Sequence, residues 1–331
     1  MRVYRDGDAN LQDIATERIA VIGYGIQGRA QALNLRDAGL RVAVGNRDDA
    51  YAARARDDGF DVHEIGAAAA QASIVLLLIP DEAQPDVFAE RIRGRLAPGS
   101  ALVVAHGFAL RYGFLDVPEG VDVLLLAPRL PGRYVRDRFV AGSGVPAYVD
   151  VARDATGRGW ARLLALAKGI GATRAGALAL TATQETELDL FSEQFTLPLV
   201  FRALEIAFEE LVAAGYPPEA AVMDLHGSGE LGQILMRAAD VGLYTMLQSD
   251  GSPACRYGVL TQRPAVVDEA GLRQEARRVL ERIRDGSFAR ELMEDQRAGH
   301  PVLTQLTEAS QTLPLGDAEQ RLRTPLATDK V

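Results

Sequence analysis

A glycine-rich turn near the N-terminus restricts the fold more than any other feature of the sequence. A short β-branched run, Arg18–Ile22, leads into Gly23-Tyr-Gly-Ile-Gln-Gly28, and a helical pattern follows over residues 29–38. In this order of strand, G-x-G-x-x-G turn and helix, the glycines let backbone amides approach a pyrophosphate at the helix N-terminus. A second strand is expected at residues 40–45, the proper distance away. The sequence therefore predicts a dinucleotide-binding fold, with Gly23, Gly25 and Gly28 at the cofactor, rather than an incidental glycine-rich turn.

The loop after the second strand is where such a fold recognises the ribose of the adenosine. It reads Asn46-Arg47-Asp48-Asp49. Acids at this place accept hydrogen bonds from a free 2′-hydroxyl and repel a 2′-phosphate, whereas Arg47 could stack on the adenine or hold that phosphate. Two acids against one arginine favour NADH slightly over NADPH. For Asp49 a solvated turn is the alternative.

Further apolar runs predict more strands, at residues 73–79, 101–105 and 121–126. Continuous runs of this kind are typical of a parallel sheet buried on both faces, and ligands bind beyond the carboxyl ends of its strands. His106 follows one of these ends, where chemistry is favoured over a structural role. Arg129 and Arg133 follow another and would supply fixed positive charge to an anionic substrate or phosphate. Solvated loop arginines are the alternative for these two.

From about Thr181 onward, strand-like runs give way to amphipathic helical patterns. We therefore expect an α/β Rossmann-type domain over residues 1–180 and an all-α domain over residues 181–331. In the first helical pattern, residues 185–216, Asp189 and Glu193 are four apart and share one helix face. Two like charges among apolar neighbours favour a cation between them, and Mg²⁺ prefers carboxylate oxygens. From this pair alone, solvated acids on an amphipathic helix are the favoured interpretation.

A later helical stretch, residues 219–236, holds two more polar pairs at helical spacing: Asp224 with Ser228, and His226 with Glu230. Either pair could converge with the first on one or two metal ions, or could simply face solvent. Beyond Gln311 the chain is polar and is expected to fray.

Composition restricts the class of protein. The formal net charge of −9 argues against a nucleic-acid partner, because phosphate binding depends on excess lysine and arginine. The N-terminus lacks an apolar signal-peptide core, and the longest apolar run is too short to cross a bilayer. The single cysteine, Cys255, excludes an internal disulfide and a cysteine-based zinc site. A cytoplasmic enzyme without a membrane partner is the expected class.

Taken together, the motifs resemble those of ketol-acid reductoisomerase in its short (class I) form, over nearly the full length. The matching stretches are Gly23–Gly28, Pro80-Asp-Glu82 with Gln84, Ala105-His-Gly-Phe108, Ala127-Pro128, Pro131-Gly132, residues 169–176, residues 185–194 and residues 285–289. The resemblance implies a Mg²⁺-dependent alkyl migration in a 2-acetohydroxy acid, followed by hydride transfer from NAD(P)H. It also implies a helical domain intertwined with that of a second subunit, and so a homodimer or larger homo-oligomer.

The resemblance assigns roles to individual residues. Asp189 and Glu193 match the first pair of metal-binding acids, His106 the active-site histidine, and Ser252 the substrate-binding serine. The positions that match nucleotide contacts are Tyr24, Gly25, Ile26, Gln27, Pro80, Asp81, Glu82, Gln84 and Gly132.

The departures from the family pattern fall around the substrate. The family's second pair of metal-binding acids is two glutamates, and here Asp224 and Ser228 stand in their places. If the register is shifted by two, the residues are His226 and Glu230 instead. Each register has one carboxylate fewer than the family, so a second metal should bind weakly. The family's active-site lysine is Arg129. Further changes place Leu130 for a glycine, Arg133 for a histidine and Arg256 for a glutamate.

We therefore expect an NAD(P)H-dependent reductase of this family that acts on a small 2-keto acid or an imine, with His106 and Arg129 stabilising charge at the reacting group. NADH or NADPH is the expected cofactor, and Mg²⁺ is a candidate metal. One alternative is a true ketol-acid reductoisomerase with an unusual second metal site. The other is a catalytically inactive, nucleotide-binding regulatory protein.

Overall fold

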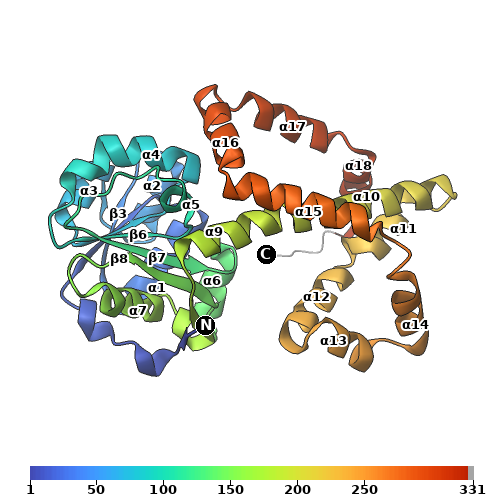
Figure 1. Cartoon of the computed structure of the whole chain (residues 1–331), viewed down its shortest axis with the longest axis horizontal. Helices are drawn as coiled ribbons and strands as arrows, with labels where there is room; N and C mark the ends of the chain where they lie inside the picture. Colours follow the sequence, from blue (N-terminus) through green and yellow to red (C-terminus); the bar gives the residue numbers. More distant parts are fainter. Residues whose placement is uncertain (327–331) are drawn as a thin grey trace. The chain divides into compact units, whose positions relative to one another are not determined.

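The computed structural model describes residues 1–326, and the chain divides into two compact units, Met1–Asp189 and Leu190–Val331 (Figure 1). The division lies later than the expected boundary at residue 180, inside the first helical pattern. Asp189 therefore belongs to the first unit and Glu193 to the second.

A nine-stranded mixed sheet forms the first unit, in the order β1-β9-β8-β7-β6-β5-β2-β3-β4. The six strands from β4 to β7 are parallel, and the order reverses between β2 and β5, where an open α/β sheet binds its ligands. The strands are β1 Val3–Tyr4, β2 Arg18–Ile22, β3 Arg41–Gly45, β4 Val62–His63, β5 Ile74–Leu77, β6 Ala101–Val104, β7 Asp122–Pro128, β8 Ala147–Arg153 and β9 Ala177–Ala179.

The strands predicted from apolar runs, β2, β3, β5, β6 and β7, are parallel, and the sheet is mixed only because of further strands at one edge. Strand β8 runs antiparallel to β7, and β1 antiparallel to β9. These strands escaped the sequence analysis because β1, β4 and β9 have only two or three residues, and β8 alternates polar and apolar side chains instead of forming an apolar run.

Helices cover both faces of the sheet (Figure 1). They are α1 Ile26–Asp37, α2 Ala50–Asp57, α3 Ile65–Gln71, α4 Gln84–Val87, α5 Phe108–Arg111, α6 Gly132–Val140, α7 Gly159–Gly169 and α8 Ala172–Ala175, and α9 Ala182–Phe191 begins in this unit. Shorter helical segments are η1 Asp6–Asp8, η2 Leu11–Ile14, η3 Asp81–Ala83, η4 Phe88–Ile92 and η5 Arg93–Arg95.

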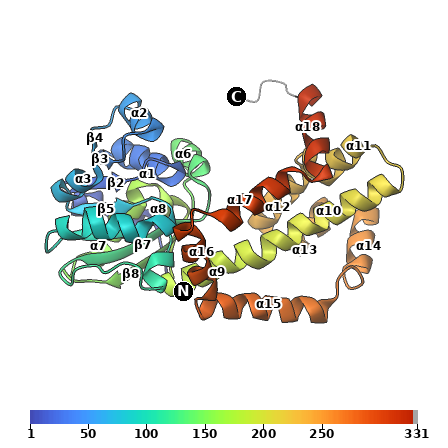
Figure 2. The same ribbon diagram turned by 90° about the horizontal axis from the view of Figure 1, so that it is seen from above.

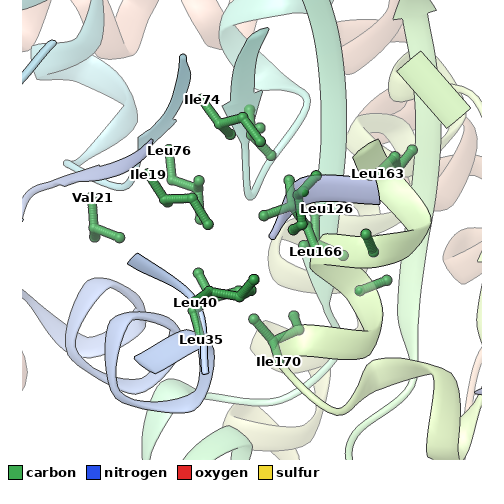
Figure 3. Packing of buried hydrophobic residues seen from close by; sticks show 14 of the residues in the cluster. Ile19, Val21, Leu35, Leu40, Ile74, Leu76, Leu126, Leu163, Leu166 and Ile170 are labelled. Atoms are coloured by element: carbon green, nitrogen blue, oxygen red, sulfur yellow. The ribbon is translucent and has the colours of Figure 1, made fainter. Parts of the chain in front are cut away.

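Successive residues of the central strands point to opposite faces, so each strand contributes to two hydrophobic clusters. On one face, Ile19 and Val21 of β2 and Ile74 and Leu76 of β5 belong to the same cluster as side chains of α1 and α7 (Figure 3). On the other face, neighbouring residues of β2 and β5 pack with α3 and η4. Burial on both faces explains the continuous apolar runs of the sequence.

Arg162 of α7 joins this helix to the sheet through a buried ion network. Its side chain is 4% exposed and pairs with Glu17 at 3.0 Å and with Asp122 of β7 at 2.9 Å. Thr156 donates two further hydrogen bonds to the Asp122 carboxylate. A buried guanidinium with two carboxylate partners cannot be removed without leaving charge uncompensated.

The described residues of the second unit form helices joined by turns, with no strand among residues 190–326 (Figure 2). Its helices are η6 Ser192–Thr196, α10 Leu197–Ala213, α11 Pro218–Val222, η7 Met223–Gly227, α12 Glu230–Val241, α13 Leu243–Asp250, α14 Pro253–Gln262, α15 Glu269–Arg284, α16 Ser287–Arg297, α17 Pro301–Gln311 and α18 Pro314–Leu326. The α/β and all-α classes predicted for the two parts of the chain are thus confirmed. No helix within residues 1–326 is both long and apolar enough to cross a membrane.

The expectation that the chain frays beyond Gln311 is wrong up to Leu326, because α18 occupies this stretch. Ala318 of α18 is fully buried in a cluster with Phe208, Ala221 and Val222. The prediction failed because the segment is mostly polar and only a few of its side chains form an apolar face. Residues 327–331, the last part of that expectation, lie outside the described residues.

We predict that Arg162→Met lowers the free energy of unfolding of the first unit by about 3–5 kcal/mol, because it strands two buried carboxylates. Arg158→Met is the matched control: Arg158 pairs with the same Glu17 at 3.2 Å but is 52% exposed, and its loss should cost less than about 1 kcal/mol. Denaturant titration followed by fluorescence of Trp160, which precedes Arg162 in α7, measures both. Equal losses in the two variants would contradict the role assigned to the buried network.

Candidate functional site

The glycine-rich turn between β2 and α1 has the close backbone packing that requires glycine. Gly23 has φ +91°, and a Cβ there would lie 2.6 Å from Cγ2 of Ile79. A Cβ on Gly28 would lie 1.9 Å from the carbonyl oxygen of Gly23. The N-cap of α1 is Gly25, which has no side chain to cap the helix amides. This is the geometry of a turn that receives a phosphate.

Tyr24 serves the framework of this turn. Its ring is 1% exposed, and its hydroxyl donates to Oδ2 of Asp58 at 2.9 Å. Burial and this hydrogen bond to a carboxylate raise the pKa of the Tyr24 hydroxyl. Asp58 also pairs with Arg29 of α1 at 2.7 Å, and the hydrogen bond from Arg29 lowers the pKa of Asp58. The ring of Tyr24 is therefore unavailable to a nucleotide, although the sequence places it among the nucleotide contacts.

Gly132 brings the loop after β7 against the start of α1. A Cβ on Gly132 would lie 1.9 Å from the carbonyl oxygen of Ile26. The side chain of Gln27 donates to the carbonyl oxygen of Leu130 at 3.0 Å. Two segments that are far apart in the sequence, and that both match nucleotide contacts, thus lie side by side. Ile26, at their contact, is 74% exposed.

In the loop after β3, Asp49 stabilises the start of α2. Its carboxylate caps α2, accepting from the amides of Tyr51 and Ala52, and pairs with Arg47 at 2.8 Å. The hydrogen bond from Arg47 is the main reason that the pKa of Asp49 is lowered. Asp48, in contrast, is 91% exposed and pairs with Arg56 at 3.3 Å. Of the two acids expected at the ribose, Asp48 is the one with an accessible carboxylate.

A polar cluster lies beyond the carboxyl ends of β5, β6 and β7. His106, two residues past β6, meets Asp81 of η3, with 2.6 Å between Nδ1 and Oδ2. The other oxygen of Asp81 accepts from Gln84 at 3.0 Å, and Gln84 is itself buried. Asp81, expected at the cofactor, is thus the residue that orients the imidazole of His106. Pro80 caps the same short segment, and Glu82 lies within it.

Arg129, one residue past β7, joins this cluster to α9. One guanidinium nitrogen lies 3.1 Å from Oε1 of Glu185, and the other donates to Oδ1 of Asp189. The second oxygen of Glu185 accepts from the backbone amide of Gly107 at 2.8 Å. Oδ2 of Asp189 lies 3.7 Å from Nε2 of His106. Two residues predicted to be catalytic and one predicted to bind metal therefore meet in one place.

The charges of the cluster shift two pKa values. Burial disfavours the charged form of His106, but the hydrogen bond to Asp81 and the nearby carboxylates outweigh it and raise the pKa of His106 to about 9. Burial raises the pKa of Glu185 to about 7, although His106 and the amide of Gly107 oppose this shift. At neutral pH His106 is an imidazolium whose buried Nε2 has no hydrogen-bond partner among residues 1–326.

Glu185 is the functional candidate that the sequence analysis missed. It is fully buried and bonded to both Arg129 and Gly107. The signal was present, because Glu185 precedes Asp189 by four residues and so shares its helix face. The prediction from the sequence instead paired Asp189 with Glu193 and gave Glu185 no role.

The remaining predicted residues belong to the second unit. Glu193 in η6 and Asp224 in η7 are exposed, and so is Ser228, which follows η7. His226, the ligand of the shifted register, instead contacts Glu319 of α18, with 2.7 Å between Nε2 and Oε1. Ser252 is the N-cap of α14 and accepts from the amide of Cys255 at 3.2 Å. These assignments to metal and substrate stay predictions.

The cluster also offers a test of metal binding. His106, Glu185 and Asp189 each present a ligand atom, all within 4.8 Å of one another, which is a spacing that suits one cation. The guanidinium of Arg129 nevertheless bonds both carboxylates, and both oxygens of Glu185 have partners. With Arg129 in this position the cluster does not fit a Mg²⁺ ion; of the acids that the family resemblance assigns to the metal, Asp189 is the one that belongs to this cluster.

Comparison with known proteins supports the two-part fold and the dinucleotide-binding turn. The NADPH-binding domain of acetohydroxy acid isomeroreductase matches residues 13–176, and the C-terminal domain of ketol-acid reductoisomerase matches residues 183–327. Ketol-acid reductoisomerase (NADP(+)) of Pyrobaculum calidifontis is 43% identical over 316 residues, with 95% of each chain covered. The enzyme of the same name from Tropheryma whipplei is 41% identical, covering 97% of this chain and 96% of its own.

Solved structures lead to the same family. The structure of an NADH-preferring ketol-acid reductoisomerase from an uncultured archean has a TM-score of 0.94 and 32% identity, and covers 99% of this chain and 100% of its own. The resemblance drawn from the motifs is confirmed. The chain belongs to the ketol-acid reductoisomerase family and is an NAD(P)H-dependent oxidoreductase.

Proposed function

We propose that this protein reduces a small 2-keto acid to the 2-hydroxy acid with NAD(P)H, and that alkyl migration is not its main reaction. The observation that carries the proposal is the pair of His106 and Arg129 beyond the ends of β6 and β7. His106 is charged, and its buried Nε2 has no hydrogen-bond partner among residues 1–326 and lies 3.7 Å from Oδ2 of Asp189, while Arg129 holds a permanent positive charge in the same cluster. Such a pair suits a carbonyl oxygen that gains negative charge during reduction.

Each residue has a defined part in this reaction. When bound, NAD(P)H supplies the hydride that adds to the keto carbon. His106 donates the Nε2 proton to the keto oxygen, so that the substrate gains one hydride and one proton and becomes the alcohol. Asp81 keeps the imidazole oriented and protonated through the 2.6 Å contact at Nδ1. Arg129 stabilises the negative oxygen and the substrate carboxylate, because its charge does not depend on pH.

Alkyl migration requires metal ions that the residues of this chain are poorly suited to bind. The resemblance assigns that step to two Mg²⁺ ions, and each register of the second metal pair in this chain lacks a carboxylate. In the first pair, one carboxylate oxygen of Asp189 already accepts a hydrogen bond from Arg129. Reduction needs a proton donor and a positive charge, and His106 and Arg129 supply them.

The exposed carboxylate of Asp48 supports NADH as the preferred cofactor. It would accept hydrogen bonds from the 2′-hydroxyl of NADH and repel the 2′-phosphate of NADPH. Arg47, which could hold that phosphate, is already paired with Asp49 at 2.8 Å.

A homodimer is the expected assembly. The second unit exposes large apolar side chains on its helices and on the loop between α14 and α15: Phe201 at 59%, Leu235 at 50%, Tyr257 at 74%, Leu260 at 52%, Val266 at 73% and Leu306 at 62%. A second copy of the chain is the partner we propose for these faces, as the family resemblance implies.

The substrate prediction is tested by oxidation of NADH and NADPH with two compounds. Reduction alone converts 3-hydroxy-3-methyl-2-oxobutanoate, whereas 2-acetolactate needs migration first. We predict turnover of the first compound, a rate at least about 100-fold lower for the second, and a higher kcat/KM with NADH than with NADPH. His106→Gln should remove the activity and leave NADH binding intact.

Other results would reject parts of the proposal. Equal turnover of both compounds would restore the ordinary isomeroreductase reaction. A preference for NADPH would remove the role given to Asp48. NADH binding without turnover of these compounds, other 2-keto acids or imines would leave the inactive regulatory protein as the better explanation.

The assembly prediction concerns mass in solution. Light scattering should give at least twice the 35.6 kDa of one chain. Phe201→Glu should shift the mass toward the monomer, because it places a charge in the proposed interface. Val140→Glu makes the same change on the first unit, at a side chain that is 68% exposed, and should leave the mass unchanged. A monomeric wild type would exclude the dimer.

A further inference from the structure

Arg129 stands where the carboxylates of α9 would otherwise need a cation. Glu185 is fully buried and Asp189 is 24% exposed, and their charges repel at this short range. One guanidinium contacts both, with its two terminal nitrogens directed to different carboxylates. The cation lies over the ring of Tyr148, 5.1 Å from the ring centre, which further holds it in place.

The chemistry of the side chain matters as much as its charge. A guanidinium is planar, presents several donors in a fixed fork and stays charged at every accessible pH. A lysine, which the family resemblance places at this position, has a single nitrogen on a flexible stem. A lysine can approach one carboxylate while the other stays available to a metal ion, whereas Arg129 bridges the two.

No oxygen of Glu185 is left for a metal. Oε1 accepts from Arg129 and Oε2 accepts from the amide of Gly107. A divalent ion could bind here only by displacing the guanidinium of Arg129 from the carboxylates. The displaced guanidinium would remain close to the ion, and the two positive charges would repel each other. The disagreement with the metal set that the family implies lies at Asp189, because Oδ1 of this carboxylate accepts from Arg129.

We propose that Arg129 is the cation of this site: its guanidinium bonds both Glu185 and Asp189 in place of a divalent metal, and the reduction proceeds without metal. The second part of this statement rests on the proposed function, and the first part does not. Arg129 then both binds the carboxylates of α9 and faces the reacting carbonyl, so that hydride transfer is separated from the metal-dependent migration.

Binding of Mn²⁺ to the purified full-length protein tests the first part without any assay of activity. The electron paramagnetic resonance signal of free Mn²⁺ reports how much ion is bound. We expect weak binding by the wild type and at least about tenfold tighter binding by Arg129→Lys. The added binding should disappear in the double variant Arg129→Lys/Asp189→Asn, which places the ion at this cluster.

Arg133→Lys is the matched control. It makes the same substitution four residues further on, at a side chain that is 78% exposed and paired with Asp137, and should bind Mn²⁺ like the wild type. If Arg129→Lys has lost its native circular dichroism, Arg129→Met replaces it, with the same expected gain. Tight binding by the wild type that Asp189→Asn abolishes would overturn the proposal, as would a folded Arg129 variant with no gain.

The second part is measured by keto acid reduction in metal-free buffer. The wild-type rate should be the same with EDTA and with added Mg²⁺, whereas a rate that requires Mg²⁺ would overturn it. If no keto acid is turned over, the proposed function fails, and the Mn²⁺ titration still decides whether Arg129 replaces the metal.

Discussion

The bridge from Arg129 to Glu185 and Asp189 is the interaction on which the site depends. It connects the end of β7 to α9, and through Glu185 it also holds the amide of Gly107, next to His106. Without a cation at this place, two carboxylates would face each other in a poorly hydrated cluster, and one of them would have to take up a proton. The bridge therefore holds the two acids of α9 together and keeps the histidine loop in position.

The sheet explains how residues far apart in the sequence reach this bridge. Parallel strands β5, β6 and β7 end at the same edge, so Asp81, His106 and Arg129 follow three neighbouring strand ends. The glycine-rich turn follows β2 at this edge, beside β5. Gly132 completes the arrangement, because only glycine lets the loop after β7 lie against the start of α1. A nicotinamide cofactor and a keto acid can be brought together here by the fold that the motif predicted.

The sequence was sufficient for the features that depend on local pattern. The turn, the apolar central strands and the helical second half follow from glycine spacing and hydrophobic periodicity. It was not sufficient for pairings across the fold: nothing local indicates that Asp81 orients His106, that Asp58 holds the hydroxyl of Tyr24, or that Glu185 is buried. The antiparallel edge was missed because β8 has no continuous apolar run, and α18 because its burial rests on a few small side chains such as Ala318.

A crystal structure with NADH and oxamate, an unreactive analogue of a 2-keto acid, would test the central claim most directly. We predict that the oxamate carbonyl oxygen accepts from Nε2 of His106 and contacts Arg129, with the nicotinamide ring against the same carbonyl carbon and the guanidinium still bonded to Glu185 and Asp189. A metal ion between these two carboxylates with Arg129 displaced, or oxamate bound away from His106, would contradict it.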